Sequence, residues 1–539
     1  MPRARSSEAR RAAATARPGP TRDERLRLAR RVDWRFLLPS PDLGRVAVMG
    51  TIDDDLRAAL AALGPVTQIG DDRSTHAGIT YDTVVASGHI ERSRLAVAAS
   101  AVAGSGRLVL EVGGPLAGPL VDGRSSGIGA AVRLGRSLEA GGFGSVRTWW
   151  TWPSHARAVS WARIDDPIAV RAMVERRLGR RIGRLAGDLA GRLVRRPAGE
   201  RLLGLGAPAL TLIATRAGPA DGIIEHRLAP PAGAEPGEPT TGLLVLSPRY
   251  RASAHVVGLG LDEAVGTIAR VVKVARLADD STLAHEAAIL GALGPTLGAT
   301  GRCPLLIDAP GLPTEIGGVR WPVLVETGID GAPLDGAAVR RDRGEAVRGV
   351  ASFLGALPVR RATDRATPIA TRLSEALAQI RAIGRVDGGA DLGVLAERAS
   401  PVLATLADAP LPRVFEHGDP AHPNLLVLPD GSVGAVDWER GESDGLPLHD
   451  LTIALAYIAA ADRGAKDAGS QAMAFRAALA GPDPWAATVL DREAVRVGVD
   501  TALRPALVVA SCARSVAWLA GHLEATRVAP EAGGADGRD

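Results

Sequence analysis

The chain has 539 residues, too many for one ordinary domain, and this length predicts about three folded units. Its formal net charge is +4, from 64 Lys and Arg against 60 Asp and Glu, and the scattered arginines form no basic stripe with interleaved aromatic residues, which excludes a typical nucleic-acid binder. No apolar run reaches the ~18 residues that a membrane span requires, because Arg514 interrupts the longest one. The two cysteines, Cys303 and Cys512, are far apart in the sequence and are expected to be buried free thiols in a reducing cytoplasm.

The first residues of the chain differ in composition from the rest of it. Residues 1–30 are rich in Arg, Ala and Ser, contain Glu8, Asp23 and Glu24, and lack an apolar core. A secretory signal needs such a core, so this stretch predicts a disordered or loosely helical leader instead. At the other end, we expect a disordered tail over residues 531–539.

Residues 31–216 alternate between short β-type runs and helical stretches rich in Ala and Leu. The runs, each bounded by Gly, Asp or Pro, cover residues 45–49, 65–69, 82–86 and 107–112, with helical stretches such as 56–63 and 93–102 between them. Strands that alternate with helices predict a parallel sheet with helices on both faces. We therefore expect an α/β N-terminal domain of the Rossmann-like type.

Two later strands, a Trp-rich one over 147–152 and another over 209–214, extend this order of elements. The order resembles that of class I methyltransferases, which use S-adenosylmethionine. Such enzymes have a Gly-rich turn after the first strand, whereas here Gly50 is soon followed by Asp53, Asp54 and Asp55. These side chains would crowd a nucleoside and repel a carboxylate. We expect a degenerate domain with a structural or recognition role.

A second β-rich block begins at residue 241, after a stretch rich in Pro, Gly, Ala and Glu over 217–240 that predicts an interdomain linker. Residues 251–260 predict a hairpin whose small-residue tip, at Ser253, would lie over nucleotide phosphates. The strand 269–274 carries Lys273, one of only two lysines in the chain. Because arginine fills nearly every other cationic position, this lysine indicates a need for a compact charge that reaches phosphates.

The last quarter of the chain carries three hard oxygen donors on two neighbouring loops. Asp419 and Asn424 come after the apolar entry 414–415, and Asp437 comes after two short strands turned at 429–431. Transfer of a phosphoryl group from ATP needs an Asp that receives the acceptor's proton, and an Asn and an Asp that hold magnesium. Asn424 is the only asparagine in the chain, which argues against a chance turn residue.

The motif His417-Gly418-Asp419, then four residues, Asn424, an apolar strand and Asp437-Trp438-Glu439 resembles the signature of the aminoglycoside phosphotransferase and choline kinase family. The resemblance implies a bilobal, protein-kinase-like α+β fold, with an N-lobe over 241–328 and a C-lobe with the acceptor site over 329–530. The loop from Pro420 to Pro423 departs from the family's usual Leu-His-Pro-Gly run, and leaves the role of His422 open.

The resemblance also implies roles for single residues. Asp419 would be the catalytic base, and Asn424 and Asp437 the magnesium ligands. Glu286, in a helix that opens near Ala284, would hold Lys273 on the α- and β-phosphates. Adenine would meet backbone groups around Glu326 and Thr327, where the strand from Trp321 runs into a turn between the lobes.

The sequence thus predicts a kinase that uses ATP and Mg²⁺ to phosphorylate a hydroxyl of a small molecule resembling an aminoglycoside, choline or a sugar. The acidic segment with Glu439, Glu442, Asp444 and Asp450 would suit a cationic acceptor, although Asp450 would serve equally well as a helix cap. Two alternatives stay open. One is a pseudokinase-like nucleotide sensor or scaffold whose N-terminal domain recruits a protein partner, and the other is a bifunctional methyltransferase and kinase.

Overall fold

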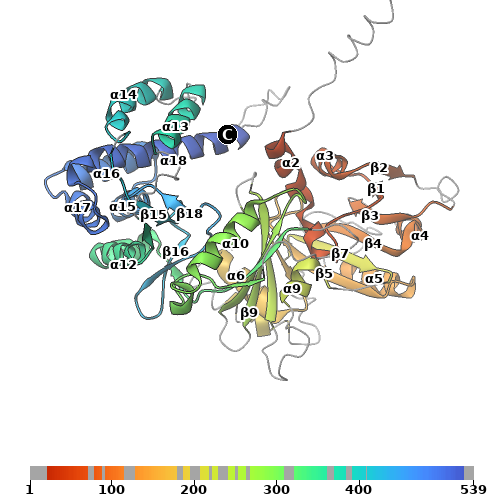
Figure 1. Cartoon of the computed structure of the whole chain (residues 1–539). Helices are drawn as coiled ribbons and strands as arrows, with labels where there is room; N and C mark the ends of the chain where they lie inside the picture. Colours follow the sequence, from red (N-terminus) through yellow and green to blue (C-terminus); the bar gives the residue numbers. More distant parts are fainter. Residues whose placement is uncertain are drawn as a thin grey trace, which may run out of the picture.

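The computed structural model describes the chain in segments. These are residues 21–70, 78–87, 92–113, 128–178, 186–187, 189–192, 194, 207–217, 221–228, 241–248, 253–262, 267–308, 321–360, 369–383, 391–407 and 409–526. Figure 1 shows an N-terminal unit, a mainly β middle part and a helical C-terminal part.

The N-terminal unit is built on a sheet whose first four strands are parallel. The strands are β1 (Val46–Gly50), β2 (Val66–Ile69), β3 (Tyr81–Ser87), β4 (Val102–Gly113), β5 (Ser145–Trp152), β6 (Ser160–Arg163) and β7 (Ala209–Thr215). Strands β2, β1, β3 and β4 pair in parallel, whereas β7 lies antiparallel between β4 and β5, and β6 is antiparallel to β5. The expected parallel sheet is therefore correct for four strands only, and the Rossmann-like assignment stays a prediction.

Helices separate these strands along the chain. They are α3 (Asp54–Leu63), α4 (Arg92–Ser100), α5 (Ile128–Ala140), α6 (Pro167–Leu178) and α9 (Ile223–Leu228). The aspartates after β1 have a local role here, because Asp53 is the N-cap of α3 and accepts a hydrogen bond from the backbone N–H of Leu56 at 2.6 Å.

One continuous sheet joins the N-terminal unit to the middle part of the chain. Strand β8 (Thr241–Leu246) pairs with β6 on one side and with β9 (His255–Asp262) on the other. The sheet has 12 strands in the order β11-β12-β10-β9-β8-β6-β5-β7-β4-β3-β1-β2. The predicted linker over 217–240 therefore does not separate two independent domains. It contains α9, and residues 218–220 and 229–240 of it lie outside the described residues.

A helical segment near the N-terminus ties the two parts together a second time. It consists of α2 (Arg22–Ala29), which begins with a capping box of Thr21 and Glu24, and η1 (Arg30–Leu37). Of the two forms expected for residues 1–30, disordered or loosely helical, disorder is wrong from residue 22 onward, where the chain is helical. Residues 1–20 lie outside the described residues. Figure 1 shows α2 beside the point where the N-terminal unit meets the C-terminal part.

We call this segment the N-terminal strap (residues 22–37). It contacts both the N-lobe and the N-terminal part of the sheet. Toward the N-lobe, Asp33 accepts hydrogen bonds from the guanidinium of Arg276 at 2.8–3.1 Å and from the hydroxyl of Ser247 at 2.8 Å. Toward the N-terminal sheet, Arg31 pairs with Glu111 at 2.6 Å. The side chains of Asp33 and Arg276 are both fully buried, so their pair lacks contact with water.

The N-lobe consists of the antiparallel end of the long sheet and one helix. Its elements are β8, β9, β10 (Ile268–Ala275), α10 (Thr282–Leu293), β11 (Leu306–Asp308) and β12 (Val323–Thr327). Val272 and Val274 of β10 and the run Val323-Leu324-Val325 of β12 are buried, which suits central strands rich in β-branched residues.

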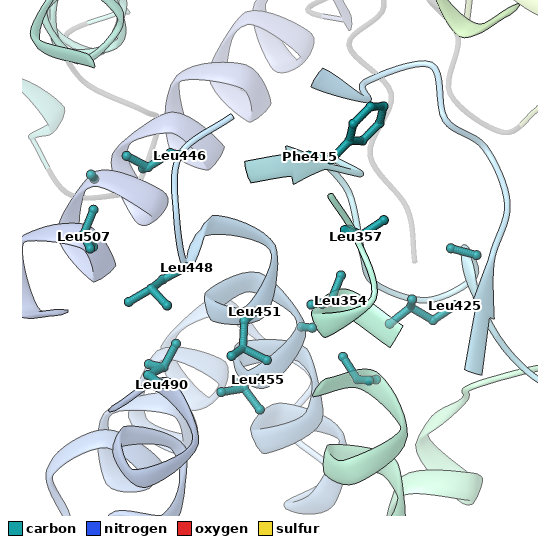
Figure 2. Packing of buried hydrophobic residues seen from close by; sticks show 14 of the residues in the cluster. Leu354, Leu357, Phe415, Leu425, Leu446, Leu448, Leu451, Leu455, Leu490 and Leu507 are labelled. Atoms are coloured by element: carbon teal, nitrogen blue, oxygen red, sulfur yellow. The ribbon is translucent and has the colours of Figure 1, made fainter. Parts of the chain in front are cut away.

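The C-lobe is mainly helical, with two small sheets at its centre. Its helices are α11 (Gly336–Arg341), α12 (Arg343–Gly355), α13 (Ile369–Ile383), α14 (Leu392–Ala404), α15 (His449–Asp462), α16 (Ala468–Ala480), α17 (Trp485–Val497) and α18 (Arg504–Thr526). The sheets are β13 (Ala332–Pro333), β16 (Leu425–Val427) and β17 (Val433–Ala435), and β14 (Val359–Arg360), β15 (Arg413–Glu416) and β18 (Glu442–Gly445). Leucines of several helices, among them Leu354, Leu451, Leu490 and Leu507, face one another in the C-lobe core, and Phe415 of β15 lies at the edge of this group (Figure 2).

Two expectations from composition need correction. Residues 501–519 are long and apolar enough to cross a membrane by length and composition alone, so one described stretch does qualify. The same test is passed by core helices, and α18 buries Leu507 and Ala510 fully in the C-lobe. Of the two cysteines, Cys303 is buried as expected, whereas Cys512 is exposed.

We expect the pair Asp33–Arg276 to be essential for stability. The variant Asp33→Ala should lower the free energy of unfolding by about 3–5 kcal/mol, because it leaves a buried guanidinium without its partner. The control Arg25→Ala removes an exposed pair with Asp279 from the same strap and should change it by about 0–1 kcal/mol. Urea unfolding followed by tryptophan fluorescence tests both, and equal effects of the two variants would contradict this interpretation.

Candidate active site

Lys273 lies at the centre of a buried charged cluster between the lobes. Its ammonium donates to Glu286 Oε1 on α10 at 2.5 Å and to Asp437 Oδ1 at 3.0 Å, and lies 3.7 Å from Glu326 Oε1 on β12. The same Oε1 of Glu286 accepts a hydrogen bond from the backbone N–H of Trp438 at 3.0 Å. Glu286 therefore fixes both the lysine and the residue directly after Asp437.

The cluster strongly perturbs the ionisation of its members. Burial by itself would lower the pKa of Lys273, but the carboxylates of Asp437, Glu286 and Glu326 outweigh it and raise that pKa well above its ordinary value. Burial, with repulsion from Glu286 and Asp437, raises the pKa of Glu326 to about 8. For Asp437 burial acts in the same upward direction, yet the nearby ammonium outweighs it and lowers the pKa to about 2. Asp437 is thus ionised at neutral pH, and Glu326 is largely protonated.

The loop that carries Asp419 and Asn424, residues 417–424, comes directly after β15 and has a compact shape. The backbone N–H of Asp419 donates to His417 Nδ1 at 3.2 Å, and Asn424 Nδ2 donates to the backbone oxygen of Asp419 at 3.2 Å. The turn between them closes through the backbone N–H of Asn424, which donates to Ala421 O at 2.7 Å. These bonds hold Asp419 and Asn424 on one short loop despite the unusual residues between them.

His422 lies inside this loop and packs against a C-lobe helix. Its ring stacks on Tyr457 of α15, with ring centroids 6.4 Å apart. Tyr457 in turn donates its hydroxyl proton to Leu334 O at 2.7 Å. His422 therefore contacts the C-lobe through its ring face.

Gly418 is required by the close approach of a second loop. Its φ is +83°, and a Cβ at this position would lie 2.4 Å from the backbone oxygen of Arg440. Arg440 stacks on Trp518 at 4.0 Å, and its Nη1 lies 3.8 Å from Asp419 Oδ2. The glycine thereby allows this guanidinium to lie beside the carboxylate of Asp419.

Asp450 anchors the loop, a role that the sequence does not reveal. It is buried, and its carboxylate accepts hydrogen bonds from the backbone N–H groups of His417 at 2.6 Å and Gly418 at 3.0 Å. It lies in the first turn of α15 without capping that helix, so the predicted cap is wrong. It is not among the residues that line the cavity beside the loop. The pairing with residues more than 30 positions away leaves no local signal.

A cavity of about 910 Å³ lies beside the catalytic loop, between α10, α13 and α18. Gly418, Glu439, Arg440 and Trp518 are among its lining residues. Of the acidic side chains expected there, Glu439, Glu442 and Asp444 line the cavity and Asp450 does not, and arginines accompany them. Arg514 lies 3.2 Å from Glu442, and Arg372 lies 3.6 Å from Asp444. The cavity is therefore lined by both negatively and positively charged side chains.

The remaining predicted site residues lie at the edges of this arrangement. Ser253 precedes β9, and its hydroxyl donates to His255 O at 3.3 Å. Thr327 ends β12, but its hydroxyl accepts from the backbone N–H of Leu305 at 2.9 Å and so belongs to the pairing with β11. The carboxyl group of Glu326 faces Lys273. The structure thus brings four predicted site residues into one cluster: Lys273 on β10, Glu286 on α10, Glu326 on β12 and Asp437 on the loop after β17. Asp419 and Asn424 lie on the loop after β15.

Residues 252–487 match the model of the phosphotransferase enzyme family. The C-terminal half of the chain belongs to this family. No curated protein matches the chain.

Solved structures of related phosphotransferases resemble this half of the chain only remotely. One is an aminoglycoside phosphotransferase in a ternary complex with AMP-PNP and hygromycin B, with 13% identity and a TM-score of 0.34, covering 52% of this chain and 92% of that one. Another is choline kinase LicA from Streptococcus pneumoniae, with 11% identity and a TM-score of 0.28, covering 51% and 92%. Amicoumacin kinase hAmiN has 12% identity and a TM-score of 0.32, covering 54% and 84%. Similarities of this size do not establish a shared activity.

The donor set of this phosphotransferase half suits a hard divalent cation. Asp437 is ionised, its φ is +69°, and about a third of its side chain is exposed. Asn424 uses its amide nitrogen on Asp419 O, which leaves the amide oxygen as a ligand. Carboxylate and amide oxygens are the ligands that magnesium prefers.

Glu326 should make stability depend on pH. Between its ordinary value of 4.5 and about 8, the native carboxyl group keeps a proton that the unfolded chain releases, so the free energy of unfolding falls as pH rises through this window. The variant Glu326→Gln should flatten this fall, by at most about 1.4 kcal/mol per pH unit. Urea unfolding at a series of pH values measures the difference, and parallel profiles of the two proteins would exclude this effect.

Asp450→Ala should loosen the catalytic loop. It leaves two buried N–H groups without acceptors, at a cost of about 1–3 kcal/mol each in unfolding free energy. Asp467→Ala, which removes an exposed cap from α16, should cost only about 1 kcal/mol. Thermal and urea unfolding compare the variants, and a smaller loss for Asp450→Ala than for Asp467→Ala would show that the anchor is unimportant.

Proposed function

We propose that this protein is a kinase that transfers the γ-phosphoryl group of ATP to a hydroxyl group of a small molecule, with a divalent metal ion, Mg²⁺, as cofactor. The proposal extends the phosphotransferase assignment to a nucleotide, a metal and a kind of acceptor. The observation that carries it is the joint placement of Lys273, Glu286 and Asp437 in one buried cluster, beside the loop of Asp419 and Asn424.

Each group has a chemical task that its surroundings determine. Glu286 fixes the ammonium of Lys273, which would bind the α- and β-phosphates of the nucleotide. Asn424 and Asp437 would hold the magnesium ion. When bound, magnesium neutralises charge on the phosphate oxygens. Phosphoryl transfer needs such positioning and charge stabilisation more than covalent chemistry.

Asp419 would accept the proton of the acceptor hydroxyl at a carboxylate oxygen. Its backbone is held by His417 and Asn424, and the guanidinium of Arg440 lies 3.8 Å from Oδ2. A fixed carboxylate beside a cation stays oriented while it takes up the proton, which is the requirement for a general base. The adjoining cavity of about 910 Å³ would hold the acceptor.

The side chains that line this cavity give a weaker indication of the acceptor's charge than the cluster gives of the reaction. Glu439 lines it, as a cationic acceptor requires, whereas Glu442 and Asp444 are paired with arginines. We propose a hydroxyl-bearing molecule with a cationic group near Glu439. Aminoglycosides, choline and amino alcohols have this chemistry, and neutral sugars serve as the comparison.

For the N-terminal unit we propose a structural role in place of methyl transfer. At the carboxyl ends of β1 and β4, Arg31 of the strap binds Asp53 at 2.7 Å and Glu111 at 2.6 Å. Ligands of open α/β sheets bind at this edge, which charged side chains of the protein occupy here. Saturable binding of S-adenosylmethionine to the full chain would overturn this proposal and favour the bifunctional alternative.

The central test of the kinase proposal is Asp419→Asn. Loss of the general base should lower kcat by about 10²–10⁴-fold while nucleotide affinity stays nearly unchanged, because the amide keeps the shape of the side chain. The measurement is magnesium-dependent ATP turnover against pooled hydroxyl acceptors, with the phosphorylated product identified by mass spectrometry. Asp491→Asn on α17, paired with the surface residue Arg504, is the matched control and should retain activity.

Three outcomes separate the alternatives. Turnover with one pool that disappears in Asp419→Asn supports a kinase and begins to define its acceptor. Turnover that Asp419→Asn retains would contradict the assigned base. Binding of nucleotide without turnover against any pool would overturn the kinase proposal in favour of a nucleotide sensor.

A further inference from the structure

A histidine and two carboxylates from the two lobes converge at the edge of the Lys273 cluster. They are His255 at the start of β9, and Asp437 and Glu439 after β17. Each offers one ligand atom, and the three atoms lie within 4.8 Å of one another. Small side-chain rotations would bring these atoms to the bond lengths of about 2.0–2.2 Å that one shared metal ion requires.

The imidazole of His255 has a buried atom without a partner. The residue is 4% exposed, and no hydrogen bond to Nδ1 is formed by the described residues. Nδ1 lies 3.6 Å from Glu439 Oε2, too far for a good hydrogen bond. A buried polar atom without a partner is costly, and a metal ion between the two side chains would satisfy it.

The charges around the histidine favour a cation. Lys273 contacts the carboxyl groups of Glu286, Glu326 and Asp437, and Glu439 adds a fourth. Glu326 is largely protonated, so one ammonium stands against the carboxyl groups of Glu286, Asp437 and Glu439. In addition, Oε2 of Glu286 and Oε2 of Glu326 are buried without hydrogen-bond partners among the described residues. A divalent ion would offset part of this excess of acidic groups.

We propose that His255, Asp437 and Glu439 form a site for a divalent transition-metal ion of the Zn²⁺ type. Imidazole together with carboxylates suits Zn²⁺, Co²⁺ and Ni²⁺, whereas Mg²⁺ prefers oxygen ligands alone. Three protein ligands leave a fourth position open. The site goes beyond the proposed kinase function, because its histidine comes from the N-lobe and has no task in phosphoryl transfer.

Such a site would act as an inhibitory clamp. Its ligands connect β9 of the N-lobe to the loop after β17 of the C-lobe, so the bound ion ties the lobes together. It also occupies Asp437, which the proposed kinase needs for magnesium. Transition-metal ions should therefore compete with magnesium.

The test is a titration of the full chain with Co²⁺, without nucleotide or acceptor. Cobalt takes the place of zinc in sites with nitrogen and oxygen ligands and has visible absorption bands that report its ligands. We expect a saturable band that Zn²⁺ removes and Mg²⁺ does not. His255→Ala and Glu439→Gln should each weaken Co²⁺ binding at least about tenfold, because even an outer partner of a ligand contributes that much. The control His226→Ala, an exposed histidine on α9, should leave the titration unchanged.

Absence of a saturable band, or the same titration with His255→Ala and Glu439→Gln as with the unaltered chain, would overturn the proposal. His255→Gln, which keeps a polar side chain, replaces His255→Ala if circular dichroism shows that the alanine variant does not fold. The titration uses neither ATP nor an acceptor. A protein that binds Co²⁺ through His255 but does not phosphorylate any acceptor would therefore disprove the kinase and leave this site intact.

Discussion

The contact between Lys273 and its carboxylates is the interaction on which the arrangement of both lobes depends. A buried ammonium is stable only with partners, and here the partners come from α10, β12 and the loop after β17. Glu286 links them, because the same oxygen accepts from the lysine and from the backbone of Trp438. The position of α10 against the sheet is thereby coupled to the position of Asp437. The proposed binding of phosphate by Lys273 and of metal by Asp437 depends on these contacts.

The C-lobe contributes a rigid base for that cluster. Its core is one buried cluster of leucines and alanines that also contains Phe415 and Trp438, whose ring centroids lie 6.5 Å apart. Phe415 lies on β15, four residues before Asp419. The buried carboxylate of Asp450 accepts hydrogen bonds from the backbone of His417 and Gly418, which fix the loop on this core. The loop that carries Asp419 is therefore held in place from the side of the core, and its position does not depend on contacts at the protein surface.

Much of the site can be predicted from the sequence because its residues are rare here or closely spaced. Lys273 stands out among arginines, Asn424 is unique, and Asp419 lies only five residues before it. Runs of Val, Leu and Ile between turn residues predict the strand positions to within a few residues.

The remaining features depend on contacts between distant residues. Asp450 and His255 act on segments far away in the sequence, so no spacing indicates their roles. The pair Asp33–Arg276 joins positions 243 residues apart, which no local pattern indicates. Strand β6 has four residues, too few for a clear pattern, and yet its pairing with β8 decides that two predicted domains share a sheet.

The pairing of β6 with β8 determines where the chain can be shortened without exposing a strand edge. Strand β8 pairs with β6 and β9, and a protein shortened to begin at residue 241 would present β8 to solvent with a row of unpaired backbone N–H and C=O groups. Such an uncovered edge recruits other chains and promotes aggregation. The N-terminal unit therefore protects the phosphotransferase half, whether or not it binds a ligand of its own, and a gene that lost it would have to evolve a new cover for this edge.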